Sequence, residues 1–318
     1  MPKLLPASSL SEAVRVSFND GIARVENQAK PQPFKTVGIV GPGLIGGSFA
    51  LALKEAGLSE RVIAAGRQSS NLERAKELGV IDEAVSMEYL AQHADLIFIA
   101  VPVKAFAKVL SQLAPHLSDK VIITDGGSTK YDLIVEAREI LGVRSNQFLP
   151  LHPIAGSHQS GAEAAISDLY KDRKLIITPL QENSLEDIGL LTATWQTIGA
   201  AVYCMDAKIH DTIFAATSHF PHYISAAYMN SILASEHSDL FLTMAGTGFQ
   251  DFTRIAASSP EMWNDIFYAN KEAMLSQLDC FMEQLLETKA YLENNQESKM
   301  FDWFKQASDA RKNWRLKS

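Results

Sequence analysis

The sequence Val37-Gly38-Ile39-Val40-Gly41-Pro42-Gly43-Leu44-Ile45-Gly46-Gly47-Ser48 decides which fold is expected. An apolar, β-branched run passes directly into a Gly-x-Gly-x-x-Gly turn, and a helical pattern follows. In such a turn Gly41 permits the tight reversal, Gly43 lets a pyrophosphate approach the backbone, and Gly46 lets the helix pack closely on the strand. The first N–H groups of the helix, at Leu44, Ile45 and Gly46, would then point at the phosphates. The pattern predicts a dinucleotide-binding site, although a glycine triplet alone is also compatible with a simple turn.

Strand and helix patterns alternate through residues 36–205. Strands are expected at 61–65, 95–102, 121–125, 148–151, 175–178 and 201–204, with helices between them. This alternation is typical of a parallel sheet covered by helices on both faces. We therefore predict an α/β fold, namely a Rossmann-type doubly wound and mostly parallel sheet. Val101 and Pro102, which end a strand, are expected to contact the cofactor.

From residue 206 to residue 318 the pattern is helical throughout. Ser259 and Pro260 have the residue types of a helix start, and residues 271–292 form a long helical run. The apolar positions exceed what one layer of helices buries alone, so this second, all-α domain is expected to form a homodimer. Packing on the first domain only is the alternative. Residues 1–35 are an N-terminal extension to which the sequence gives no role.

Composition narrows the class of partner. The chain has 318 residues and a net charge of −8, and no block of lysine or arginine suggests nucleic-acid binding. Two distant cysteines indicate neither a disulfide framework nor a zinc site. No apolar run is long enough for a membrane span, and the first 30 residues lack a signal-peptide core. A cytoplasmic protein that acts on a small molecule is expected.

The turn after the second strand bears on the choice of dinucleotide. NAD-binding domains commonly place an acidic residue there to bind the ribose 2′-OH, but this chain has Gly66, followed by Arg67 and Ser69. A cation and hydroxyls at a helix start suit a 2′-phosphate, which favours NADP. If Arg67 instead stacks on the adenine, it would stabilise bound NAD as well as bound NADP.

Four further stretches carry polar side chains. They are 124–130, which includes Ser128; 152–156, which begins at His152; 210–222, which contains His210-Asp211, His219 and His222; and 248–254, which ends at Arg254. The first two follow strands, where doubly wound sheets bind ligands. Singly, each has a plain structural explanation, such as a helix cap, a loop histidine or a surface charge. His219 and His222 have the spacing of metal ligands, but no cysteine or carboxylate pair accompanies them and no metal is expected.

Together and in this order, these motifs resemble the prephenate/arogenate dehydrogenases of tyrosine biosynthesis. The resemblance runs from about Thr36 to Lys271 and includes 41–48, 125–130, 152–156 and 251–254. It implies a Rossmann domain joined to a helical dimerisation domain. It also implies NAD(P)-dependent oxidation of the C4 hydroxyl of prephenate or arogenate, with loss of the ring carboxylate as CO₂ and aromatisation.

The same resemblance implies roles for individual residues. His152 would accept the C4 hydroxyl proton, and Ser128 would orient that hydroxyl. Arg254 would bind a substrate carboxylate with its planar guanidinium. His222 would be a second substrate contact, and His219 is the weaker candidate of that pair.

Two positions depart from some prephenate-specific members. This chain has His158 where those members carry a glutamate and Gln250 where they carry a lysine, both near the substrate side chain. The preference between prephenate and arogenate is therefore left open. Because the sequence stops at Ser318 without an appended regulatory module, control by such a module is not expected.

Two other functions stay open. A β-hydroxyacid or imine oxidoreductase shares the glycine turn and a helical second domain, but a lysine-based catalytic helix would be expected there. A regulator that binds NAD(P) without catalysis would also contain the glycine turn.

Overall fold

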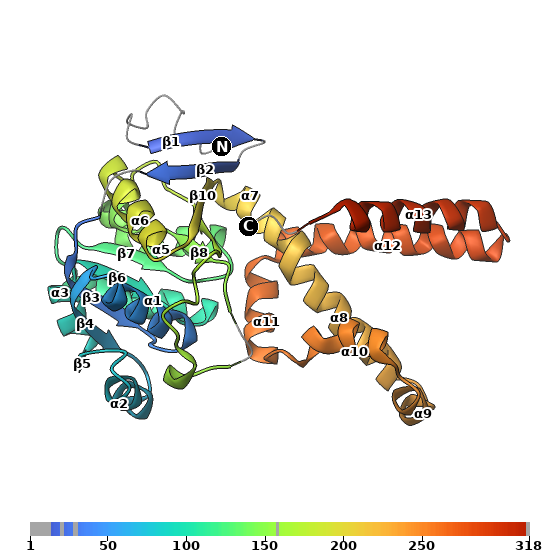
Figure 1. The fold of residues 1–318 in the computed structure, drawn as a ribbon, viewed down its shortest axis with the longest axis horizontal. Helices are drawn as coiled ribbons and strands as arrows, with labels where there is room; N and C mark the ends of the chain where they lie inside the picture. Colours follow the sequence, from blue (N-terminus) through green and yellow to red (C-terminus); the bar gives the residue numbers. More distant parts are fainter. Residues whose placement is uncertain (1–13, 20–21, 28–30, 157–158, 316–318) are drawn as a thin grey trace. The chain divides into compact units, whose positions relative to one another are not determined.

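The computed structural model describes residues 14–19, 22–27, 31–156 and 159–315. It divides the chain into two compact units (Figure 1). The first unit comprises Met1–Asp211 and Ser259–Ala269, and the second comprises Thr212–Ser258 and Asn270–Ser318. The two units part after Asp211, six residues beyond the boundary expected at 205/206, and residues 259–269 belong to the first unit.

Ten strands make two sheets in the first unit. The strands are β1 (Val14–Asn19), β2 (Ile22–Asn27), β3 (Phe34–Val40), β4 (Ser59–Ala65), β5 (Glu83–Ala84), β6 (Leu96–Ile99), β7 (Ile122–Asp125), β8 (Leu151–Pro153), β9 (Lys174–Ile177) and β10 (Ala201–Met205). One sheet is parallel, in the order β5-β4-β3-β6-β7, and the other is mixed, in the order β1-β2-β10-β9-β8. The predicted mostly parallel sheet is thus confirmed for strands β3 to β7.

Helices cover both faces of the parallel sheet. The first unit contains the helices α1 (Leu44–Glu55), α2 (Ser69–Glu77), α3 (Met87–His93), α4 (Phe106–Leu113), α5 (Tyr131–Leu141), α6 (Leu185–Thr197) and α11 (Pro260–Ala269). Alternate residues of β4 enter opposite cores: Val62 and Ala64 pack in the cluster that contains α1 and α6, whereas Ile63 and Ala65 pack in the cluster that contains α3, α4 and α5. This period of two is what a strand buried on both faces requires.

Two stretches differ from the expectation. The strand expected at 148–151 begins later, at Leu151, and runs antiparallel to β9; Phe148 forms only an isolated parallel bridge to Ile123 of β7. The extension before residue 35 contains the β1–β2 hairpin, and β2 pairs antiparallel with β10. Strands β1 and β2 therefore extend the mixed sheet.

The second unit is helical, as expected. Its helices are α8 (Phe220–Leu233), α9 (Ser238–Thr243), α10 (Thr247–Thr253), α12 (Lys271–Glu293) and α13 (Glu297–Asn313), and α7 (Ala207–Phe214) crosses the boundary between the units. A π-helical turn, Ala215–His219, precedes α8, and a short 3₁₀ helix, Arg254–Ala257, follows α10. Helices α12 and α13 lie side by side (Figure 1).

Candidate active site

The glycine turn has the geometry that a pyrophosphate site needs. Gly41 has φ of +87°, and a Cβ there would lie 2.5 Å from the carbonyl oxygen of Ala100. A Cβ on Gly46 would lie 2.4 Å from the carbonyl oxygen of Gly41, so both positions require glycine. Around Gly43, by contrast, the nearest atom to a built Cβ is the backbone nitrogen of Gly161 at 4.0 Å. The backbone is open where a phosphate would approach.

Helix α1 begins at Leu44 directly after this turn, with Gly43 as its N-cap. The first N–H groups of a helix, here those of Leu44, Ile45 and Gly46, have no acceptor within the helix and attract anions. The sequence of the first turn contains no acid that would oppose a phosphate. These residues fit the pyrophosphate of a dinucleotide.

The end of β6 forms the neighbouring wall. Because β6 pairs with β3, residues 100–102 follow it beside the glycine turn. A Cβ on Gly41 would lie 3.2 Å from Cγ1 of Val101, and Pro102 is exposed. Both residues therefore stand at the carboxyl edge of the sheet, where doubly wound folds bind ligands.

The ribose turn follows β4. Gly66 is partly buried, and Arg67 and Ser69 are exposed at the start of α2, whose N-cap is Gln68. A Cβ on Gly66 would lie 3.6 and 3.8 Å from Cδ2 and Cγ of Leu72 and 3.9 Å from Cδ of Pro42, all ordinary contacts. The space at the Cβ position therefore does not require glycine at residue 66, and the lack of an acidic residue there is a chemical difference from the pattern typical of NAD-binding domains.

A segment between β8 and β9, residues 159–170, is bonded to α2. We call it the linking segment. Asn71 of α2 accepts a hydrogen bond from the backbone N–H of Ala162 at 3.3 Å. Arg74 of α2 forms an exposed ion pair with Glu163 at 2.9 Å. The linking segment thus contacts the helix that carries the ribose turn.

The linking segment is also bonded to α1. The hydroxyl of Ser48 accepts a hydrogen bond from the N–H of Ile166 at 3.0 Å. Tyr170 is buried and donates its hydroxyl proton to the carbonyl of Ile45 at 2.6 Å. Burial raises the pKa of Tyr170 well above its usual range, so this donor stays protonated. Both helices that begin at the cofactor turns are therefore joined to one stretch of chain.

A buried ion pair organises the loop that carries Ser128. Lys130 and Asp125 form it with exposed side-chain fractions of 0% and 1%. Asp125 also accepts from the N–H of Gly127 at 2.8 Å and of Leu151 at 3.2 Å, and Lys130 Nζ donates to the carbonyl of Leu151 at 2.8 Å. The loop after β7 is thereby tied to the residue that precedes His152.

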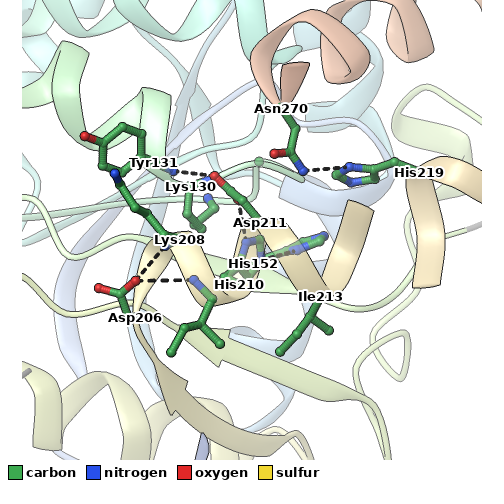
Figure 2. A network of polar contacts seen from close by, with 12 residues as sticks. Lys130, Tyr131, His152, Asp206, Lys208, His210, Asp211, Ile213, His219 and Asn270 are labelled. Carbon is green, nitrogen blue, oxygen red and sulfur yellow. Dashed lines mark hydrogen bonds and ion pairs between the residues drawn. The ribbon is translucent and has the colours of Figure 1, made fainter. Parts of the chain in front are cut away.

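His152 lies in β8, half-buried, and its ring is held by a chain of hydrogen bonds (Figure 2). Nδ1 of His152 lies 2.9 Å from Nε2 of His210, and Nδ1 of His210 lies 2.8 Å from Oδ1 of Asp211. Asp211 accepts two further bonds at 2.9 Å, from the N–H of Lys130 at Oδ1 and from the N–H of Tyr131 at Oδ2. His210 is completely buried. The sequence contains this pair as His210-Asp211 but gives no sign that it meets His152.

In the second unit, His222 and Arg254 belong to one group. His222 lies on α8 and donates through Nδ1 to the carbonyl of Ser218 at 2.9 Å. Burial lowers the pKa of His222, and the positive charge of Arg254 lowers it further, against the effect of the Ser218 bond. Arg254 begins the 3₁₀ helix after α10 and is exposed. A guanidinium and a neutral imidazole in one group suit a carboxylate ligand.

Gln250 and His219 lie near this group in sequence but differ in setting. Gln250 is exposed on α10, four positions before Arg254. His219 is 1% exposed, and its Nδ1 accepts from the side-chain amide of Asn270 at 3.2 Å. This bond fixes the π-helical turn to the start of α12. His158 lies outside the described residues.

In the ranges that the structure describes, no group of three or more His, Cys, Asp or Glu side chains is arranged to hold a metal ion. No helix among these residues is both long and apolar enough to cross a membrane.

A turn that fits a pyrophosphate, a ribose turn and a hydrogen-bonded histidine in one unit are typical of a dinucleotide-dependent oxidoreductase. The model of the prephenate dehydrogenase nucleotide-binding domain matches residues 49–204, and that of the prephenate dehydrogenase dimerization domain matches residues 206–306. The chain belongs to the prephenate dehydrogenase family. The predicted family, fold class and oxidative decarboxylation in tyrosine biosynthesis are thereby confirmed.

Individual relatives agree. Prephenate dehydrogenase of Bacillus subtilis is 35% identical over 279 residues, which are 87% of this chain and 75% of the relative. The structure of A. aeolicus prephenate dehydrogenase with hydroxyphenyl propionate and NAD⁺ has a TM-score of 0.81 and 32% identity, covering 87% of this chain and 97% of that one. Synechocystis arogenate dehydrogenase has a TM-score of 0.77 and 28% identity, covering 88% of this chain and 100% of that one.

Proposed function

We propose that the chain oxidises prephenate, arogenate or both, with NADP as the preferred cofactor and His152 as the proton acceptor. The observation that carries this proposal is the position of His152. It lies on β8, the edge strand of the mixed sheet, in the same unit as the glycine turn, and its Nδ1 lies 2.9 Å from Nε2 of His210. The bond at Nδ1 fixes the orientation of the ring that we propose as the base.

The bound nicotinamide supplies a hydride acceptor. His152 takes the proton of the C4 hydroxyl, because a neutral imidazole has a proton affinity suited to this transfer near pH 7. Ser128 orients the same hydroxyl from the loop tied to Leu151 by Asp125 and Lys130. The ring carboxylate then leaves as CO₂, and the ring becomes aromatic.

The second unit supplies the carboxylate site. In this proposal, which follows the family resemblance, Arg254 binds a substrate carboxylate, His222 gives a further polar contact, and Gln250 contacts the substrate side chain. The resemblance gives the same role to His158, which lies outside the described residues. His219 stays a weaker candidate, because its ring is buried and bonded to Asn270. Arg254 and Gln250 are exposed, so both side chains are accessible to a ligand.

For the cofactor, Gly41, Gly43, Leu44, Ile45 and Gly46 fit the pyrophosphate. Val101 and Pro102 line the same sheet edge. Arg67 and Ser69 bind the 2′-phosphate that distinguishes NADP. The A. aeolicus relative was solved with NAD⁺, so the proposed preference rests on the turn at Gly66 alone.

A homodimer through the second unit is part of the proposal. The family model for residues 206–306 is a dimerization domain. Several large apolar side chains of this unit are exposed in the single chain, among them Leu240, Met244, Leu286, Phe301 and Phe304. A second copy would remove such surface from water.

The test is the absorbance change at 340 nm with prephenate and with arogenate, each with NAD and NADP. We expect turnover with at least one of the two substrates and a higher kcat/KM with NADP. Turnover of simple β-hydroxyacids but of neither cyclohexadienol would favour the alternative oxidoreductase. Cofactor binding without any turnover would favour the non-catalytic regulator.

A further inference from the structure

The hydrogen bonds behind His152 determine which of its nitrogens carries the proton. Asp211 uses both oxygens as acceptors, for the N–H groups of Lys130 and Tyr131 and for His210. A carboxylate only accepts, so Nδ1 of His210 must be the donor in the 2.8 Å contact. In neutral His210 the proton therefore sits on Nδ1, and Nε2 is the acceptor.

The same logic extends one ring further. Since Nε2 of His210 accepts, Nδ1 of His152 donates across the 2.9 Å contact. The lone pair of His152 is then on Nε2. An imidazole whose Nδ1–H is bonded to an oriented acceptor is the arrangement that makes Nε2 a base.

We infer that His210 and Asp211 are positioning residues that hold His152 in its Nδ1–H tautomer and share the positive charge that proton capture creates. This inference rests on the proposed role of His152. When the C4 hydroxyl proton binds Nε2 of His152, the Nδ1 proton moves toward Nε2 of His210, and the charge then faces the Asp211 carboxylate. We call the hydrogen-bonded chain His152–His210–Asp211 the relay. One proton enters the relay at Nε2 of His152, and one proton shifts from His152 toward His210. No covalent bond to carbon changes, and no co-reactant is needed.

Burial makes the relay effective. His210 is 0% exposed and Asp211 is 6% exposed, so water does not compete for these bonds. Asp211 is also fixed independently of the histidines, because it bonds the N–H groups of residues 130 and 131 at the N-terminus of α5. The carboxylate thus has a set position against which both rings are aligned.

The first test is spectroscopic. The full-length protein is labelled with ¹⁵N-histidine, and the signals of His152 are assigned by their loss in His152→Asn. At a pH where the ring is neutral, the pattern of ¹⁵N shifts and couplings is expected to show the Nδ1–H tautomer. A resting Nε2–H tautomer would overturn the inference.

The second test separates positioning from folding. His210→Gln keeps an acceptor where Nε2 of His210 lies, and His210→Leu removes it. We expect kcat to fall by about 10²-fold or more in His210→Leu, with substrate KM and cofactor Kd within about two-fold, and by less than about ten-fold in His210→Gln. The ¹⁵N pattern of His152 should stay Nδ1–H in the glutamine variant.

A matched control is Asp206→Ala, which removes the acceptor for the N–H groups of Lys208 and Ile209 at the start of α7. It should lower Tm and leave kcat within about two-fold, because it perturbs the same helix without entering the relay. Equal kcat in wild type, His210→Gln and His210→Leu would overturn the relay while leaving His152 as the base. Full activity of His152→Asn would instead overturn the proposed function, whatever the tautomer.

Discussion

The ammonium of Lys130 bonds the carboxylate of Asp125 in a place where both side chains are excluded from solvent. Burial raises the pKa of Asp125 and lowers that of Lys130, and each charge opposes the shift of the other. A buried charge without its partner would be strongly unfavourable. Replacing either residue of the pair is therefore expected to displace the loop that carries Ser128 and the backbone of Leu151.

Lys130→Met should lower the free energy of unfolding by about 3–5 kcal/mol, because it leaves a buried carboxylate without its cation. Arg138→Met is the matched control, since the Arg138–Glu182 pair at 2.8 Å is partly exposed to solvent and its loss should cost about 0–1 kcal/mol. Urea unfolding followed by circular dichroism measures both. Equal losses of unfolding free energy in the two variants would show that the buried pair contributes no more to stability than the partly exposed pair.

His152→Asn should lower kcat by about 10²-fold or more while the Kd for cofactor stays unchanged. The reason is that the base acts only in the transition state, whereas the dinucleotide is bound by the glycine turn. Steady-state kinetics and fluorescence titration with the reduced cofactor measure the two quantities. An unchanged kcat would exclude His152 as the base.

Arg254→Gln should raise the substrate KM strongly and change kcat less, because a carboxylate contact is shared by ground and transition states. Arg311→Gln makes the same change at another exposed position of the second unit and should leave KM unchanged. An unchanged KM together with a greatly lowered kcat would show that Arg254 has a different role.

The turn at Gly66 predicts cofactor preference. A charge-assisted contact worth about 1.5–3 kcal/mol corresponds to a preference for NADP of roughly 10- to 100-fold in kcat/KM. Arg67→Ala should erase it and leave turnover with NAD nearly intact. Gly66→Asp should reverse it, because the new carboxylate repels a 2′-phosphate and accepts from a 2′-OH.

Gly66→Ala is the control for that reversal, since it occupies the space near Leu72 without adding charge. Equal weakening of both cofactors by Arg67→Ala would mean that Arg67 stacks on the adenine. A clear preference of the wild type for NAD would reject the proposed 2′-phosphate site.

His222 gives a prediction about pH. Its pKa is lowered in the folded protein from the ordinary 6.5, so the unfolded chain binds the proton more readily. Stability therefore falls as the pH drops through the unfolded pKa, and His222→Gln should lose less stability between pH 7 and pH 5. Denaturant midpoints at the two pH values measure this difference. A larger loss in the variant than in the wild type would contradict the sign.

Arg254→Gln should also raise the pKa of His222, since it removes a positive charge that disfavours protonation. NMR titration of the ring protons of His222 measures this pKa directly. Arg311→Gln again serves as the control.

Local patterns explain why part of this enzyme is predictable from its sequence. The strand, turn and helix around Gly41, Gly43 and Gly46 are predictable because they are neighbours in the chain. The pairing of Tyr203 with Arg24, by contrast, is set by packing between distant segments, and no local signal reports it. For the same reason the residue types of His152 and Asp211 suggest polar sites but not that His210 joins them.

The linking segment, which follows His152 and is fastened to α1 and α2, has a consequence for how such an enzyme diverges. In the proposed mechanism, the turns that bind the dinucleotide and the strand that carries the base are joined through one segment of polypeptide. Mutations that redesign the ribose turn are therefore expected to be epistatic with mutations around the base. The proposed carboxylate contacts, His222 and Arg254, belong to the other unit, so we expect substrate range to evolve more freely than cofactor use.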